Sequence, residues 1–167
     1  KVMASGMKTM EDVRIGFKNF SGKEGKYNRA GDRNFVIFLN EDWTEELVTE
    51  GWNVRTLQPR DPDEEPQPYL PVAVRFGARP PRIVLITSRG KTTIGEDEIS
   101  MLDWADIKQV DLVVRPYEWE VSGNTGIKAY LKSLFVTLEE DDLDLKYADV
   151  PDSAASAIIP VEEPEEF

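Results

Sequence analysis

The strongest constraint on the fold is a pair of long segments near the C-terminal end that resemble two paired strands. Val110 to Val121 and Gly126 to Leu138 are rich in β-branched and aromatic residues, which favour β-strands. Between them, Ser122-Gly123-Asn124-Thr125 is a sequence typical of hairpin turns. The chain is therefore predicted to contain a long antiparallel hairpin, and this is its best-defined unit.

A four-residue turn would place residues whose numbers add up to 247 opposite one another in this hairpin. Side chains alternate between the two faces of a strand, so one face would carry three aromatic and three cationic residues. These candidate single-stranded DNA contacts are Arg115, Tyr117, Trp119, Lys128, Tyr130 and Lys132. Bases stack on aromatic rings while Lys and Arg follow phosphates. The alternative is that the three rings cover a second packed surface of the protein.

The opposite face of the hairpin is apolar and is predicted to line the interior of the fold. Its members are Leu112, Val114, Ile127, Ala129 and Leu131. Further strands are predicted around residues 13–17, 34–39, 52–57, 69–76 and 82–87, and helices over 42–50 and 96–108. In the first strand Val13, Ile15 and Phe17 alternate with polar or small residues, and the first helix has Asn40 or Asp42 as its cap.

These elements predict a mostly β fold, an antiparallel barrel like the oligonucleotide-binding (OB) fold with inserted strands and one or two short helices. The segment 59–68 carries four prolines and four acids and is predicted to be a surface loop. One domain over residues 11–149 is expected, with residues 1–10 as a frayed lead-in and 150–167 as a flexible acidic tail.

Charge is distributed very unevenly along the chain. Residues 1–138 hold 19 basic against 21 acidic residues, whereas residues 139–167 hold one Lys against 11 acids. The body is therefore nearly neutral, and a negative sum does not exclude nucleic acid as a partner. There is no Cys and no His, which excludes thiolate or imidazole metal sites and most catalytic triads. No run of apolar residues is long enough to span a membrane, and an intracellular location is expected.

Two loops add basic residues that could contact phosphates. The segment from Ser21 to Asp32 contributes the candidates Lys23, Lys26, Tyr27 and Arg29, followed by Arg33. A weaker group consists of Arg79, Arg82, Arg89 and Lys91, with donors in the segment 87–91. Either group can equally be a solvated surface.

A resemblance to a known class of proteins accompanies these patterns. The segments RIVLITSRGKT, SMLDWADIKQVDL and VVRPYEWEVSGNTGIKAYLKSLFV, together with the acidic end at Glu165, Glu166 and Phe167, resemble phage-encoded single-stranded DNA-binding proteins. The resemblance is clearest over residues 11–149 and the tail tip. It implies an OB fold without enzymatic activity or cofactor, roles in phage replication and recombination in the bacterial host cytoplasm, and a tail that recruits replication partners.

Two other functions remain open at this stage. A magnesium-dependent nuclease would use carboxylates such as Asp111, Glu118 and Glu120 with Lys128. A protein-interaction module or DNA mimic would use the net charge of −12. Oligomeric state is not predicted, and a homo-oligomer is left open.

Overall fold

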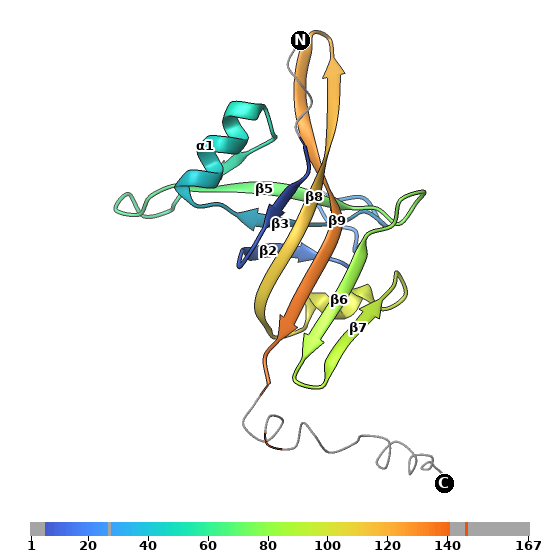
Figure 1. Cartoon of the computed structure of the whole chain (residues 1–167). Coiled ribbons are helices and arrows are strands. Elements are labelled where there is room, and N and C mark those ends of the chain that lie inside the picture. The colour runs from blue at the N-terminus through green and yellow to red at the C-terminus, as the bar shows by residue number, and fades with distance from the viewer. Residues whose placement is uncertain (1–5, 27, 141–145, 147–167) are drawn as a thin grey trace.

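The computed structural model describes residues 6–26, 28–140 and 146. In this part of the chain, nine strands, one α-helix and one 3-10 helix form the fold, and all nine strands belong to one sheet. The strands are β1 (Lys8–Met10), β2 (Arg14–Asn19), β3 (Arg33–Phe38), β4 (Arg55–Leu57), β5 (Gln67–Val74), β6 (Arg82–Thr87), β7 (Gly90–Ile94), β8 (Ile107–Val121) and β9 (Asn124–Leu138). The prediction of a mostly β fold is confirmed (Figure 1).

The hairpin of β8 and β9 forms as predicted but has a tighter turn. Only Ser122 and Gly123 connect the strands, and both have positive φ, 51° and 85°. Two consecutive residues with positive φ make a two-residue turn whose twist matches that of the flanking strands. The register therefore moves by two residues from the predicted one, and Tyr117 lies opposite Lys128. A shift of two keeps the side chains of residues 114–121 and 124–131 on their predicted faces.

Strand β9 is the centre of the sheet, because it pairs with three other strands. Along one edge it pairs with β8, and along the other it pairs first with β5 and then with β6. Both of the latter pairings are parallel, whereas the sequence predicted an antiparallel barrel. Lys132 is left over between the pairs Val114–Leu131 and Val113–Ser133, a β-bulge at the point where β9 passes from β5 to β6.

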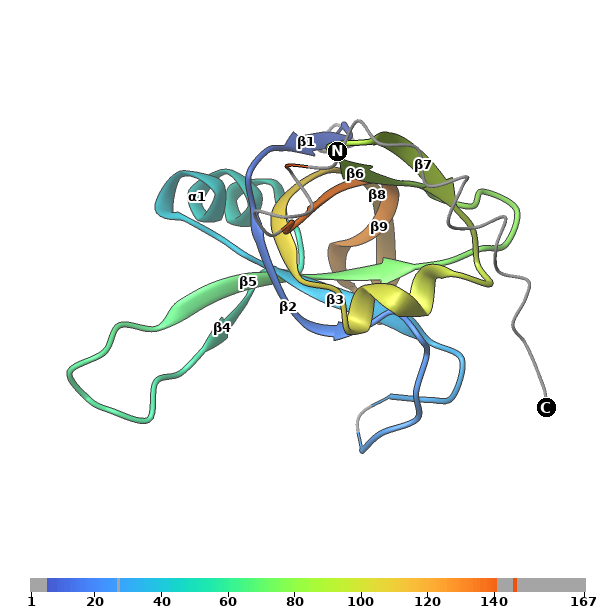
Figure 2. The same ribbon diagram turned by 90° about the horizontal axis from the view of Figure 1, so that it is seen from below.

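The main path of the sheet is β1-β8-β9-β5-β3-β2. Its strands curve around a single apolar core, as the view in Figure 2 shows. The two ends of the curve approach each other where the backbone N–H of Val13 donates to the carbonyl of Val110 at 3.0 Å. No ladder between β2 and β8 closes the sheet in the described residues. The order is compatible with an OB barrel.

The first predicted helix is confirmed as α1 (Glu41–Glu50). Asn40 is its N-cap and accepts a hydrogen bond from the backbone N–H of Trp43, and Gly51 ends the helix with φ of 96°. Leu47 is buried in the core, whereas Val48 is exposed. After the helix, Trp52 forms a parallel bridge with Ile127 of β9. The backbone N–H of Asn53 donates to the carbonyl of Ile127.

The prediction of a second helix over residues 96–108 is wrong. The chain forms only a 3-10 helix, η1 (Ile99–Asp103), and residue 107 already begins β8. Ile99 and Leu102 are fully buried, and their spacing of three suits a 3-10 turn as well as an α-helix. Strand β7 was not predicted. The loop predicted over 59–68 connects β4 to β5 through residues 58–66, with Pro68 inside β5.

The N-terminal segment is more ordered than the sequence indicated. Residues 8–10 form β1, which pairs with β8, and Met10 is fully buried. Burial by itself would lower the pKa of Lys8, but its hydrogen bonds to Glu46 (2.6 Å) and Glu50 (2.8 Å) outweigh this effect and raise it. The prediction of a frayed lead-in is therefore wrong for residues 8–10, because they add an edge strand that covers the core.

Candidate nucleic-acid interface

The outer face of the β8–β9 hairpin carries two tyrosines and two cations in contact. The rings of Tyr117 and Tyr130 lie 5.6 Å apart between centroids. Arg115 and Lys128 each lie over the ring of Tyr130, at 5.7 and 5.4 Å from its centroid. Neither cation has a carboxylate partner in the described part of the chain. We call these four residues the tyrosine cluster.

The tyrosine cluster is partly open to solvent, with Arg115, Lys128 and Tyr130 half-buried. Tyr117 is 53% exposed, and the hairpin buries its opposite face instead. The predicted interior residues are indeed buried: Leu112, Val114, Ile127, Ala129 and Leu131. Buried apolar residues therefore stabilise the hairpin from one side, while its tyrosines are held at the surface on the other.

Trp119 and Lys132, the other predicted members of this face, lie outside the cluster. Trp119 pairs with Gly126 rather than Lys128. A Cβ at Gly126 would lie only 2.6 Å from Cζ2 of Trp119, so the indole lies across the glycine backbone. Lys132 is the exposed extra residue of the bulge and does not pair with Arg115, which lies opposite Tyr130.

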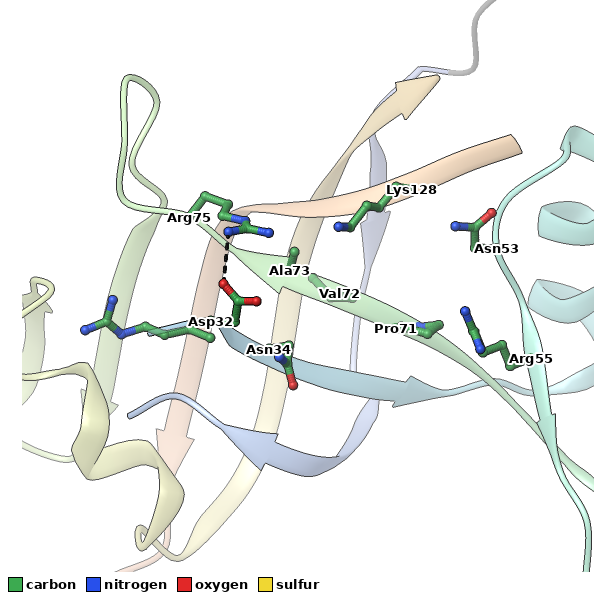
Figure 3. A pocket seen from close by; sticks show the side chains of 10 residues that line it. Asp32, Asn34, Asn53, Arg55, Pro71, Val72, Ala73, Arg75 and Lys128 are labelled. Carbon is green, nitrogen blue, oxygen red and sulfur yellow. Dashed lines mark hydrogen bonds and ion pairs between the residues drawn. The ribbon is translucent and has the colours of Figure 1, made fainter. Parts of the chain in front are cut away.

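A hollow of about 230 Å³ adjoins the tyrosine cluster. Pro71 and Ala73 of β5 and Asn34 of β3 contribute to its lining, and Lys128 belongs both to the hollow and to the cluster (Figure 3). Because Ala73 lies beside Tyr130 in the register of β5 and β9, the hollow and the cluster form one continuous surface. We call this hollow the groove.

The groove is lined by more cations than acids. Its lining residues are Asp32, Arg33, Asn34, Asn53, Arg55, Pro71, Val72, Ala73, Arg75 and Lys128. Asp32 lies 3.4 Å from Arg75 in an ion pair that Figure 3 marks, and Arg33 is held by Glu96 at 2.9 Å. Arg55 and Lys128 have no carboxylate partner among the described residues. The groove therefore keeps positive charge available for an anionic ligand.

A second group of aromatic residues lies on the same outer face, and the sequence did not reveal it. Phe17 makes edge contacts with Phe38 and Tyr69, at centroid distances of 6.0 and 6.2 Å. Arg14 lies over the Phe38 ring at 5.0 Å. We call these residues the phenylalanine cluster. Tyr69 is on β5, four residues before Ala73, so this cluster lies about 13 Å along the strand from the groove's centre.

The backbone at Phe17 explains why this cluster was missed. Phe17 has φ of 45° and lies in an irregularity of the β2–β3 pairing, so its ring turns outward and is 59% exposed. The alternation with Val13 and Ile15 had placed Phe17 on the apolar face of a half-buried strand. A positive φ is costly for a non-glycine residue and is found most often at functional sites. The exposed Phe17 ring is thus held by a strained backbone.

The loop between β2 and β3 does not join the tyrosine cluster. Lys23 lies over the ring of Trp104, 5.6 Å from its centroid, and Arg29 pairs with Asp32 at 3.4 Å. Lys26 is exposed, and Tyr27 lies outside the described residues. Of the predicted loop residues, Arg29 therefore contacts its own loop, and Lys23 contacts Trp104 beside η1.

In the weaker basic group, the donors of Ser88 are occupied by the chain itself. In the turn between β6 and β7, the backbone N–H and the hydroxyl of Ser88 both donate to Glu140 at 2.7 Å. The hydrogen bonds from Ser88 hold the pKa of Glu140 below its usual value, with smaller contributions from the charges of Arg89 and Lys108. Arg82 lies over the ring of Phe135. A carboxylate of this protein thus occupies both donors of Ser88, which belong to the segment that we had considered for a phosphate.

The carboxylates considered for a nuclease do not converge. Asp111 accepts a hydrogen bond from Asp12 N–H at 2.7 Å, and it is separated from Glu118 by seven residues, about 23 Å along β8. Among the described residues no group of three potential metal ligands is present. The tail residues Glu165, Glu166 and Phe167 lie outside the described residues. No helix in the described part is long and apolar enough to cross a membrane.

Comparison with known proteins gives one family and one group of similar folds. A family model described as "Putative phage ssDNA-binding domain" matches residues 3–167. The single-stranded DNA-binding protein from bacteriophage Enc34 has a similar fold, with a TM-score of 0.53 and 14% identity over 90% of both chains. Its structure in complex with ssDNA has a TM-score of 0.54 and 14% identity over 81% of this chain and 88% of that one. No curated protein sequence matches the chain.

Proposed function

This chain belongs to the phage ssDNA-binding domain family, and from that premise we propose that the tyrosine cluster and the groove bind single-stranded DNA. One observation carries the assignment of the site. Tyr117 and Tyr130 lie together on an exposed face with Arg115 and Lys128 beside them, and these two cations have no carboxylate partner in the described chain.

The chemistry of this site suits unpaired nucleotides. A base can stack on the exposed ring of Tyr117, because stacking requires only a π-face and tolerates any base. Arg115 and Lys128 are placed to contact phosphates on either side, and Arg55 extends the positive charge along the groove. A duplex hides the faces of its bases in its own stack, so it cannot use the tyrosines. The site therefore favours single strands with little sequence preference.

The phenylalanine cluster extends this surface toward β2. Phe17, Phe38 and Tyr69 offer further rings on the same outer face, with Arg14 as the adjacent cation. The Enc34 protein, whose fold is similar, has been solved in complex with ssDNA, which supports the view that a sheet of this shape accommodates a single strand. We propose that the bound single strand runs from the tyrosine cluster across the groove to the phenylalanine cluster.

We further propose that the chain binds ssDNA without catalysing a reaction on it. The chain protects and organises ssDNA during phage replication and recombination, in the cytoplasm of the bacterial host. The acidic end with Glu165, Glu166 and Phe167 serves as a contact for replication partners. The family supports single-stranded DNA binding, whereas a protein-interaction module or DNA mimic would lack affinity for oligonucleotides.

A titration of fluorescent oligo-dT beside a duplex of equal length tests the proposal. We expect tight binding of oligo-dT, much weaker binding of the duplex, and an affinity that falls as salt rises, because bound Lys and Arg release counterions. Val121→Ala is a matched control, since Val121 is 62% exposed at the end of the same hairpin without belonging to the cluster. Equal affinity for both forms of DNA, or none for either, would contradict the proposal.

A further inference from the structure

A third exposed aromatic residue lies beside η1, away from both clusters. Trp104 follows the last residue of η1 and is 75% exposed, although a tryptophan ring is costly to leave in water. The ring faces a hollow of about 340 Å³ between η1 and the start of the β2–β3 loop. Figure 2 shows η1 beside β2 and β3. We call this hollow the Trp104 hollow.

The hollow is built by specific contacts. Both carboxylate oxygens of Asp103 accept backbone N–H groups, from Phe20 at 2.7 Å and from Ser21 at 3.0 Å, which fixes η1 against the end of β2. The side chain of Asn19 then holds the backbone of Lys23 in both directions, accepting from its N–H at 2.8 Å and donating to its carbonyl at 2.9 Å. Lys23 is thereby positioned with its Nζ over the Trp104 ring.

The Trp104 hollow adjoins the groove, and three asparagines connect the two. Asn34 lines the groove, whereas Asn19 and Asn28 line the Trp104 hollow. Asn34 is the register partner of Asn19, and its Nδ2 donates to Oδ1 of Asn28 at 2.7 Å. Across the sheet, Asn19, Asn34, Ala73 and Tyr130 lie on successive strands, so the tyrosine cluster is about 14 Å from the edge of this hollow.

We propose that the Trp104 hollow is a further nucleotide subsite, in which a base stacks on Trp104 while Lys18 and Lys23 contact the neighbouring phosphates. The inference rests on the proposed function, because it is the strand leaving the groove that reaches this subsite. A cation beside an exposed indole is the same combination as in the tyrosine cluster. The lining also holds Glu24 and Asp103, and the carboxylate of Asp103 is already held by two backbone N–H groups. The nearby groove, together with Lys18 and Lys23 beside an exposed ring, favours a nucleic-acid strand over a second copy of this chain as the occupant.

The test measures affinity against oligo-dT length, from roughly 4 to roughly 30 nucleotides, a range that spans the site sizes of OB folds. We expect Trp104→Ala to bind the shortest oligonucleotides like the unmodified protein and longer ones about tenfold more weakly, as expected for one lost stacking contact. Trp104→Phe should recover most of this loss, because a phenyl ring also stacks. Met101→Ala, on the same 3-10 helix, is the matched control. Sedimentation confirms that each compared complex holds one protein per oligonucleotide.

Three results would overturn the inference. Unchanged affinity of Trp104→Ala at every length would show that no base reaches the ring. An equal loss at every length would place Trp104 in the main site or in folding rather than in an extension. If the unmodified protein is a dimer without DNA, and Trp104→Ala makes it a monomer with unchanged DNA affinity, the ring belongs to a contact between two copies of the chain. Tyr130→Ala, which should weaken binding at all lengths, reports separately on the proposed function.

Discussion

The two hairpins of the sheet, β8–β9 and β6–β7, have similar sequence signals for contact with DNA but differ in what occupies their polar groups. Both carry basic residues and have a tight turn. On β8–β9, Arg115 and Lys128 lie over a tyrosine with no carboxylate partner in the described chain. At the β6–β7 turn, Ser88 already donates both of its hydrogen bonds to Glu140.

This difference indicates that a basic loop can bind DNA only if the protein's own carboxylates do not occupy its hydrogen-bond donors. Glu140 lies 52 positions from Ser88 in the sequence, so no local pattern reveals that the donors of the β6–β7 turn are satisfied. The β8–β9 hairpin also supplies rings on which bases can stack, and its cations remain beside them. The comparison predicts that changes on β8–β9 alter DNA binding and that matched changes on β6–β7 do not.

The largest effect is expected from the tyrosines. Tyr117→Ala and Tyr130→Ala should each weaken oligo-dT binding by about 1–3 kcal/mol, because each removes a stacking ring. Tyr117 is the more exposed of the two, so its removal should leave the free energy of unfolding nearly unchanged. Fluorescence titration together with chemical denaturation measures both quantities. Unfolded variants whose folded fraction binds normally would instead assign the rings to the core.

The cations should affect the salt dependence more than the affinity at a single salt concentration. Lys128→Gln and Arg115→Gln should each reduce the slope of log K against log salt by about 0.7, the value for one phosphate contact on a single strand. Lys91→Gln, in strand β7, is the matched change on the other hairpin and should leave the slope unaltered. Equal reductions for Lys91 and Lys128 would remove the distinction between the hairpins.

Phe17 offers a test that separates binding from folding. Glycine tolerates positive φ and alanine does not, so Phe17→Gly should be more stable than Phe17→Ala by about 1 kcal/mol. Both variants lack the ring and should lose the same amount of affinity for oligo-dT. Denaturation curves and titrations of the two proteins provide the comparison. A DNA affinity that follows stability, rather than the presence of the ring, would show that Phe17 acts only through the fold.

The smallest effect is expected at the β6–β7 turn. Ser88→Ala removes the hydroxyl that donates to Glu140, so the lowered pKa of Glu140 should rise toward its ordinary value. In the unmodified protein the contact is present at neutral pH and is lost as pH falls through the lowered pKa. Titration of the Glu140 carboxyl by NMR measures the change. Oligo-dT affinity should not respond, and a clear loss of affinity would bring this turn into the binding site.

Patterns of alternation and turn chemistry were enough to predict most of the fold. They predicted the β8–β9 hairpin, the buried face with Leu112 and Val114, and the helix capped by Asn40. They failed where one local spacing fits two structures, as for Ile99 and Leu102 in η1, and where pairing partners are distant in sequence, as for β1 and the parallel pairs of β9.

The candidate site was predictable in its residue types but not in its extent. The tyrosines and their cations share a strand period, which survives a register shift of two. Phe17 could not be found, because its outward direction depends on a single positive φ within an irregular pairing. Trp104 gave no periodic signal, since its exposure follows from how Asp103 fixes η1 against β2.

Ultraviolet cross-linking of oligo-dT, followed by identification of the cross-linked peptides by mass spectrometry, tests the central claim most directly. We predict cross-links to peptides containing Tyr117 or Tyr130, with further ones at Phe17, Phe38 or Tyr69, and their loss when unlabelled single strands compete. Duplex DNA should compete poorly. Cross-links confined to residues 82–94 of the β6–β7 hairpin would contradict the account, because they would place the strand where the protein's own Glu140 occupies the donors.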